Sequence, residues 1–260
     1  MTREEILARF SGEDKVLASR VFDWAMEAIR ENDYRLSDFL DPQEQDLVIG
    51  LLKQFPGLAW HNFGGYRGAE RKRVAIAPDY LPSDELDWQL AAVSIQGEFE
   101  EDPPTHRDYL GSLLNLGLKR EKLGDLLVSP KGCQAIATEQ MAAFICRDLQ
   151  RVGRWRVQVE ALDLEQVTAP QQKMKKIRAT VASVRLDAVA SSGFGLSRTK
   201  LVRLIRGGAV KVNWQPTTSP DKVLEVGDVI SMRGKGRLVL VEIGGLTKKK
   251  RQVLIMERYL

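Results

Sequence analysis

Hydrophobic positions in the first 82 residues follow helical spacing first and strand-like spacing afterwards. Two amphipathic helices and two short strands are predicted there, at residues 15–31, Gln43–Phe55, Leu58–Phe63 and Arg73–Ala77. Asp41 followed by Pro42 supports the start of the second helix, because an aspartate caps free helix amides and proline needs no amide partner. Residues 1–82 are therefore expected to form an N-terminal helical region with a β-hairpin.

The pattern over residues 86–168 predicts strands and helices in the order β-α-β-β-α-β. The expected elements are Leu90–Gln96, Asp108–Leu116, Leu123–Ser129, Cys133–Ala137, a helix capped by Thr138 that runs to Arg151, and Trp155–Leu162. This order is typical of a ferredoxin-like or RRM-like middle domain. Many RRMs stack RNA bases on aromatic side chains of their central strands, but Cys133–Ala137 contains no aromatic residue. Base stacking on this sheet is therefore not expected, which leaves another mode of RNA binding or a protein partner.

A polar segment at residues 169–172 precedes a third domain, expected over residues 173–248. A basic strand-like stretch and two short helices are predicted in it, with strands near Val210–Trp214, Val229–Arg233 and Leu238–Ile243. Residues 249–260, which begin with basic side chains, are expected to form a C-terminal tail. The chain is thus predicted to be a multidomain α+β protein.

Composition mainly excludes other classes of protein. The 260 residues are 43% hydrophobic and 28% charged, which is typical of a soluble globular chain and excludes wholesale disorder or a disulfide-rich scaffold. The two cysteines and two histidines lie apart, so neither a zinc site nor another cofactor is expected. The chain starts without the apolar core of a targeting peptide, and no apolar run reaches the ~20 residues of a membrane span. We therefore expect a cytoplasmic monomer without a membrane span.

The net charge of +4 conceals two segments of opposite sign. Residues 1–169 hold 20 basic and 29 acidic side chains, a net charge of −9, whereas residues 170–260 hold 19 and 6, a net charge of +13. A basic segment of this size attracts polyanions, because binding releases their condensed counterions. Nucleic acid is the favoured partner, and a solvated basic surface or a membrane-surface patch is the alternative.

One predicted helix of the basic segment, Arg198–Arg206, separates apolar from charged side chains. Ser197 is expected to cap it, and Gly207 and Gly208 to end it. Its exposed face is expected to carry Thr199, Lys200, Arg203 and Arg206. Cations on one exposed helix face are suited to contact successive phosphates of a nucleic acid.

Five blocks of this segment resemble, in order and spacing, the S4 RNA-binding domain. They are Arg185-Leu186-Asp187, Leu196-Ser197-Arg198, Leu204-Ile205, Gly208-Ala209-Val210-Lys211-Val212-Asn213 and Leu224-Glu225-Val226-Gly227-Asp228. The resemblance implies an αL-type S4 domain, with two helices on a small bent sheet, that binds structured RNA through its basic helix face and a β-loop. The expected RNA-binding residues are Arg185, Ser197, Arg198, Thr199, Lys200, Arg203, Arg206, Lys211, Asn213, Arg233, Lys235 and Arg237.

A wider resemblance covers nearly the whole chain. It is carried by Asp38-Phe39-Leu40-Asp41-Pro42, Gly64-Gly65-Tyr66, Glu70-Arg71-Lys72-Arg73, the block from His106 to Gly117, and the block from Arg120 to Asp125. These residues resemble the YlmH family, whose cyanobacterial and plastid branch is called the photosystem II S4-domain protein. The resemblance implies a protein that binds the large ribosomal subunit carrying a stranded peptidyl-tRNA. Such a protein acts without catalysis in ribosome-associated quality control.

The middle domain adds four cations to the candidate RNA-binding residues. Arg107, Lys119, Arg120 and Lys122 are expected to form a basic, partly exposed edge that meets RNA. In the alternative interpretation, Arg107 and Asp108 form only a local helix cap and ion pair.

Two short motifs suggest catalysis, and neither has the rest of its catalytic context. His106-Arg107-Asp108 opens a kinase catalytic loop, but Leu113 stands where that loop requires Asn and the chain contains no Asp-Phe-Gly. Arg185-Leu186-Asp187 resembles the catalytic motif of pseudouridine synthases, but it belongs to the S4 helix and has no second copy. Asp187 is therefore interpreted as a structural acid.

The sequence predicts a non-catalytic protein that binds structured RNA, either ribosomal RNA or tRNA, on the large ribosomal subunit. Two alternatives stay open. One is an RNA-modifying, pseudouridine synthase-like enzyme whose acidic N-terminal part is catalytic. The other is an assembly factor whose acidic half docks a photosystem II or cell-division partner.

Overall fold

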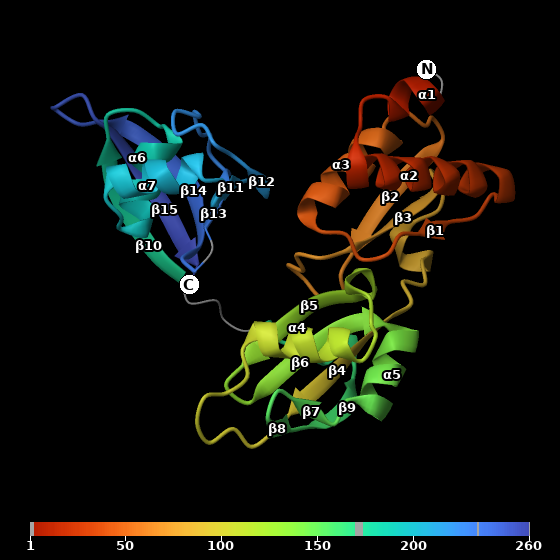
Figure 1. Cartoon of the computed structure of the whole chain (residues 1–260). Helices are drawn as coiled ribbons and strands as arrows, with labels where there is room; N and C mark the ends of the chain where they lie inside the picture. The colour runs from red at the N-terminus through yellow and green to blue at the C-terminus, as the bar shows by residue number, and fades with distance from the viewer. Residues whose placement is uncertain (1–2, 170–173, 233, 260) are drawn as a thin grey trace. The chain divides into compact units, whose positions relative to one another are not determined.

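The chain divides between residues 170 and 171 into two units, each with its own helices and sheets (Figure 1). The computed structural model describes residues 3–169, 174–232 and 234–259.

The N-terminal part of the first unit is a three-stranded antiparallel sheet with helices packed on it. Its elements are α1 (Arg3–Leu7), α2 (Gly12–Glu31), β1 (Arg35–Leu36), α3 (Pro42–Leu52), β2 (Leu58–Phe63) and β3 (Arg73–Pro78), with strand order β1-β3-β2. Helix α3 begins where it was predicted but ends at Leu52, three residues before the predicted Phe55. The Asp41 carboxylate accepts the Glu44 amide at 2.9 Å, and the Glu44 carboxylate accepts the Asp41 amide at 2.7 Å, which completes a capping box.

The rest of the first unit is built on a four-stranded antiparallel sheet with strand order β5-β6-β4-β9. Its main elements are β4 (Leu90–Gln96), α4 (His106–Asn115), β5 (Leu123–Ser129), β6 (Gly132–Thr138), α5 (Glu139–Asp148) and β9 (Gln158–Leu162). Short 3-10 turns lie at Ser83–Glu85, Arg120–Lys122 and Leu164–Gln166. Helices α4 and α5 share one hydrophobic core with the sheet, to which Tyr109, Leu113 and Ile145 contribute. The order along the chain is β-α-β-β-α-β.

Two predicted boundaries in this region are wrong, and both for the same reason. The helix expected to reach Arg151 ends at Asp148, and Arg151–Val152 form β7 instead. The single strand expected over Trp155–Leu162 is two strands, β8 (Trp155–Arg156) and β9. Strand β8 pairs with β7 in a small ribbon, whereas β9 pairs with β4. The chain changes pairing partner here, and local periodicity carries no signal for that change.

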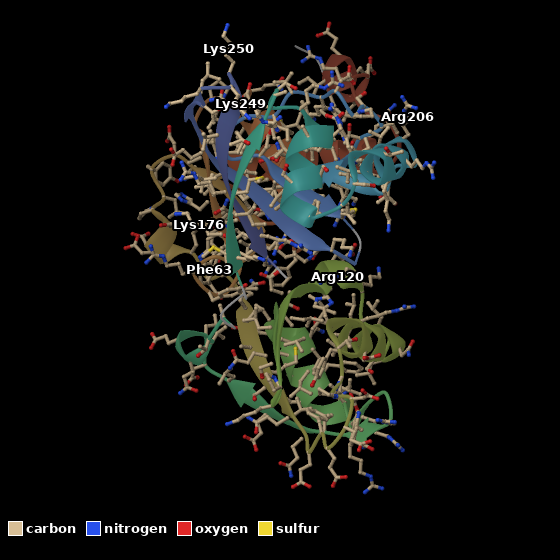
Figure 2. The ribbon with its side chains drawn as sticks, turned by 90° about the vertical axis from the view of Figure 1, so that its left-hand side faces the viewer. Phe63, Arg120, Lys176, Arg206, Lys249 and Lys250 are labelled. Atoms are coloured by element: carbon tan, nitrogen blue, oxygen red, sulfur yellow. The ribbon has the colours of Figure 1, made fainter. Side chains whose placement is uncertain are left out.

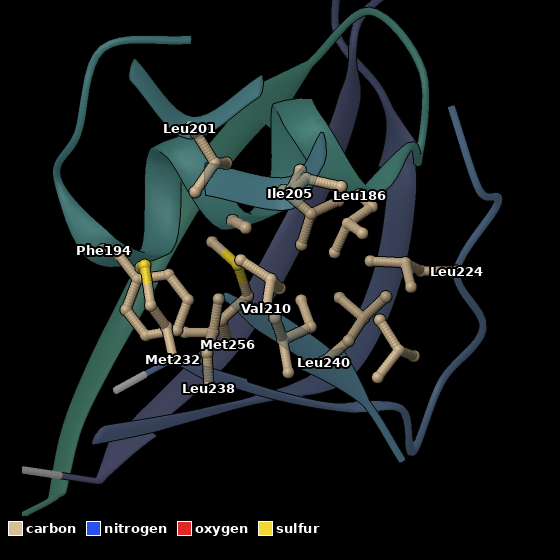
Figure 3. Packing of buried hydrophobic residues seen from close by; sticks show 14 of the residues in the cluster. Leu186, Phe194, Leu201, Ile205, Val210, Leu224, Met232, Leu238, Leu240 and Met256 are labelled. Carbon is tan, nitrogen blue, oxygen red and sulfur yellow. The ribbon is translucent and has the colours of Figure 1, made fainter. Parts of the chain in front are cut away.

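The second unit is a six-stranded antiparallel sheet with two helices packed on one face. Its elements are β10 (Met174–Val181), α6 (Leu186–Phe194), α7 (Arg198–Arg206), β11 (Val210–Val212), β12 (Gln215–Pro216), β13 (Val229–Met232), β14 (Gly236–Leu246) and β15 (Gln252–Tyr259). The strand order is β10-β15-β14-β13-β11-β12. Figure 3 shows the core, in which Leu201 and Ile205 of α7 pack on inward-facing side chains such as Val210, Leu238 and Met256.

The predicted C-terminal tail is wrong, because most of residues 249–260 form β15. This strand lies between β10 and β14 and buries Leu254 and Met256 in the core. The strand predicted over Val210–Trp214 also ends early, at Val212. Asn213 and Trp214 have φ values of 50° and 63°, and this pair of left-handed residues turns the chain into β12.

Candidate nucleic-acid interface

Helix α7 presents its cations to solvent as the sequence predicts. Leu201 and Ile205 are fully buried, and the opposite face carries exposed side chains at Thr199, Lys200, Arg203 and Arg206. Figure 2 shows Arg206 extending outward from this face. Within the described residues, no acidic group lies within ion-pair distance of Lys200, Arg203 or Arg206. These three cations are therefore available to an anionic ligand.

Ser197 and Arg198 have local structural partners. The Ser197 hydroxyl accepts the Lys200 amide at 3.4 Å and caps the helix, as predicted. The Arg198 guanidinium donates from Nε and Nη2 to Oδ2 of Asp187, at 2.9 Å and 2.7 Å. Asp187 is 3% exposed, and its other oxygen lies 3.6 Å from Nε of Arg185. The carboxylate of α6 thus holds two of the expected RNA-binding arginines and sets the start of α7.

This arrangement predicts a loss of stability in Asp187→Ala. Removing the buried carboxylate leaves the positive charges of two neighbouring arginines without their acidic partner. We expect this to lower the free energy of unfolding by about 2–3 kcal/mol, less than for a fully buried ion pair, because Arg198 is partly exposed. Hydrogen exchange of residues 174–259 in the full chain measures the change. Asp221→Ala, an exposed acid without an ion pair among the described residues, is the control of equal charge. Equal protection in both variants would contradict the structural role of Asp187.

Lys211 and Arg237 lie on the sheet face opposite the helices. The register pairs Lys211 with Ser231, Ser231 with Arg237, and Arg237 with Tyr259, so these residues form one row across the sheet. Their neighbours along the strands, such as Val210, point into the core, and side chains alternate along a strand. The expected RNA-binding residues are therefore divided between the face of α7 and the open face of the sheet.

The remaining S4 residues differ in their surroundings. The Asn213 side chain donates to Asp228 at 2.7 Å and accepts the Val229 amide at 2.8 Å, so its amide closes the turn after β11. Lys235 is exposed in the turn between β13 and β14. Arg233 lies outside the described residues.

Of the four cations in the predicted basic edge of the middle domain, two contact other groups of the protein and two are accessible. Arg120 donates to the carbonyl oxygens of Leu123 and Gly124 at 2.7 Å and 3.0 Å. Burial, together with the nearby positive charge of Arg71, lowers the pKa of Arg120 to about 10. Lys122 forms an ion pair with Asp38. Both side chains are thus used within the protein.

The other two cations of that edge are accessible. Arg107 and Lys119 are exposed and have no ion pair within the part of the chain that the structure describes. Asp108 completes a capping box with Thr105, whose amide and hydroxyl donate to it at 2.8 Å and 2.7 Å. These hydrogen bonds, with a further contribution from Arg107, lower the pKa of Asp108. Asp108 therefore acts in a helix cap, as the alternative interpretation expected, but the ion pair with Arg107 that it also expected is not found among the described residues.

Several blocks of the wider resemblance meet at Asp125. Its carboxylate accepts the Tyr66 hydroxyl at 2.8 Å, the Glu70 amide at 2.7 Å and the Arg71 amide at 3.0 Å. Arg71 also donates to the carbonyl oxygen of Phe39 at 2.8 Å. Because these residues come from both halves of the first unit, the motif joins the N-terminal sheet region to the four-stranded sheet.

The sheet face not covered by α4 and α5 is itself partly covered by other segments. Phe39 packs there with Leu90, Ala92 and Ile136, and side chains that include Phe63 and Tyr66 pack around them. This part of the face is closed to RNA bases, which agrees with the absence of aromatic residues in β6.

A basic ribbon in the middle domain was missed as a candidate site. Strands β7 and β8 and the turn between them carry exposed Arg151, Arg154 and Arg156, with the Arg154 guanidinium 4.9 Å from the ring centre of Trp155. Next to them is a hollow of about 840 Å³, to whose walls Trp155, Arg156 and Lys131 contribute. The available signal was three arginines within six residues around a tryptophan.

Neither a metal site nor a membrane-spanning helix is found among the described residues. No group of three or more His, Cys, Asp or Glu side chains is placed to hold a metal ion. No described helix combines the length and apolar character needed to cross a bilayer.

Comparison with known proteins matches three family models to successive parts of the chain. They are "YlmH, N-terminal" at residues 13–81, "Putative RNA-binding domain in YlmH" at residues 82–166, and "S4 domain" at residues 184–230. The "Ribosome-associated protein quality control protein P2" of Bacillus subtilis (strain 168) is 34% identical over 255 residues, 98% of either chain. The solved structure "Cell division protein ylmH from Streptococcus pneumoniae" is 27% identical with a TM-score of 0.52. It covers 61% of this chain and 97% of its own.

Proposed function

The chain belongs to the YlmH family, and from this premise we propose that it is a non-catalytic protein that binds structured RNA on the large ribosomal subunit. Its ligands there are ribosomal RNA and tRNA, and its role is in ribosome-associated quality control. The name of the Bacillus subtilis relative supports this role. The observation that carries the proposal is the exposed face of α7, with Lys200, Arg203 and Arg206 unpaired among the described residues, in a segment of net charge +13.

We further propose a division into three domains, over residues 1–82, 86–168 and 173 onward. In the middle domain the strand order β5-β6-β4-β9 and the element order β-α-β-β-α-β support an RRM-like fold. The third domain includes β15, so it extends beyond residue 248 to the end of the described chain.

The proposed RNA-binding residues have two roles. Lys200, Arg203, Arg206, Lys211, Lys235 and Arg237 contact phosphates, with Thr199 beside them on α7. Arg185, Ser197, Arg198 and Asn213 position these residues through the contacts described above. In the middle domain Arg107 and Lys119 are the accessible members of the predicted edge.

Salt dependence tests this proposal directly. Each phosphate neutralised by a cation contributes about −0.9 to the slope of log K against log salt, so six contacts predict a slope of about −5. Fluorescence anisotropy of the full chain with a labelled, structured RNA hairpin measures it. A slope between zero and about −1 would show that phosphates are not the main ligand of this surface.

A further inference from the structure

The turn between β14 and β15 carries three consecutive lysines and projects beyond the sheet (Figure 1). Lys248, Lys249 and Lys250 are exposed and have no ion pair within the described residues. This turn lies outside the residues 184–230 that the S4 family model matches. The cations on it are therefore not explained by the S4 motif.

Hydrogen bonds hold the turn in one conformation. The Lys250 amide donates to the Thr247 carbonyl oxygen at 2.8 Å, and the Thr247 amide donates to the Arg251 carbonyl oxygen at 2.8 Å. Arg251 in turn donates from Nη2 to the carbonyl oxygen of Thr180 in β10, at 2.6 Å. The three lysines are thus presented by a preformed turn anchored to the neighbouring strand.

Strand β10 extends this cationic surface along the edge of the sheet. Ile177 and Ala179 pack toward the core, so Lys176 and Arg178 point to the open face. The register places Lys176 five residues from the Val181–Gln252 pair at the base of the turn, roughly 17 Å along the strand. The acid facing Lys176 across the strands, Glu257, accepts the Tyr259 hydroxyl at 3.1 Å.

These cations lie away from the face of α7. Figure 2 shows Lys176, Lys249 and Lys250 along one side of the second unit and Arg206 on the other. The helices cover one sheet face, whereas Lys176 and Arg178 belong to the opposite face. Of the residues proposed above to contact phosphates, Lys211 and Arg237 share this open face on strands β11 and β14, whereas Lys176 and Arg178 lie on the edge strand β10.

We propose that Lys176, Arg178 and Lys248–Lys250 form a second RNA-binding surface that contacts the phosphate backbone of a separate RNA segment. The second unit then bridges two RNA segments, one at α7 and one at this surface. Charge complementarity identifies the ligand, since the surface offers five cations on a strand edge and a hydrogen-bonded turn. The inference rests on the proposed function, because both surfaces require an RNA ligand.

Edge strands also carry lysines for another reason, which is to prevent pairing with a further strand. That role explains Lys176 on β10, but it does not explain three lysines in the turn. Edge protection also predicts that replacing the lysines by glutamates has no effect, because a glutamate prevents strand pairing as well as a lysine does. Charge reversal in the turn therefore separates the two explanations.

The test uses the full chain and one short RNA hairpin, prepared in donor-labelled and acceptor-labelled batches. We expect the wild-type chain to bring the two labels together and give energy transfer. Lys248→Glu/Lys249→Glu/Lys250→Glu is expected to bind one hairpin without transfer. The variant loses the second binding event, and with it the contribution of about −3 that the three lysines make to the summed salt slope of the two events. Lys248→Arg/Lys249→Arg/Lys250→Arg, which keeps the charge, should behave as the wild type.

The outcomes distinguish this inference from the proposed function. If the glutamate variant keeps the wild-type energy transfer and salt slope, the second surface is refuted while RNA binding stands. If Arg203→Glu/Arg206→Glu abolishes all binding at low salt, the turn does not bind RNA by itself and the inference is also overturned. If the wild-type chain does not bind the hairpin at all, the proposed function fails.

Discussion

Arg203→Glu/Arg206→Glu is expected to weaken binding of the full chain to structured RNA about 100-fold at moderate salt. Hydrogen bonds to charged groups contribute about 1.5 kcal/mol or more each, and two of them are lost. The salt slope should become shallower by about 2, because each phosphate contact contributes about 1. Both side chains are exposed and neither has an ion pair in the described parts of the chain, so the fold should be unaffected.

Two control variants isolate the position of the charge from its amount. Arg203→Lys/Arg206→Lys keeps both charges and is expected to bind within a few-fold of the wild type. Lys15→Glu/Lys53→Glu changes the net charge equally at two exposed positions of the first unit, one in α2 and one directly after α3, and should bind as the wild type does. Equal weakening by the α7 and the first-unit glutamate variants would show a general charge effect and would contradict the assignment of α7.

Asp125→Ala is expected to destabilise the first unit by about 4 kcal/mol. Its carboxylate accepts three hydrogen bonds, two of them from backbone amides. Each bond to a charged acceptor contributes about 1.5–3 kcal/mol, and some water enters the site in the variant. Hydrogen exchange of residues 3–169 against residues 174–259, both in the full chain, measures the loss and its location.

The same variant tests whether Asp125 has a chemical or a structural role. Asp79→Ala, at an exposed position after β3, is the matched control and should leave stability unchanged. RNA affinity of folded Asp125→Ala is expected to stay within about twofold of the wild type at low temperature, because the α7 face lies in the other unit. Unchanged hydrogen exchange in Asp125→Ala would contradict the claim that Asp125 holds the two halves of the first unit together.

Helix caps and hydrophobic periodicity predicted those elements whose ends depend on residues close in the sequence. Asp41 and Ser197 cap their helices as expected, and α7 spans Arg198–Arg206 as predicted. The last strand was missed because its alternating pattern follows a run of basic residues, which favoured interpretation as a tail. Its partners, β10 and β14, are chosen by tertiary packing.

The candidate site was harder to predict than the fold, because charge alone does not reveal partners. Lys122 pairs with an acid 84 positions earlier, and Arg198 pairs with a buried acid 11 positions earlier. Neither pairing follows from spacing, so both cations were expected to be free for RNA. Arg203 and Arg206 are exposed, as expected, because apolar residues hold the opposite face of their helix in the core.

Sedimentation of the full chain with ribosomal particles on a sucrose gradient tests the central proposal most directly. We predict that the wild-type chain migrates with free large subunits at moderate salt, and that Arg203→Glu/Arg206→Glu stays at the top of the same gradient. A wild-type chain that stays at the top, or a variant that migrates with large subunits as the wild type does, would contradict RNA binding through α7 on the ribosome.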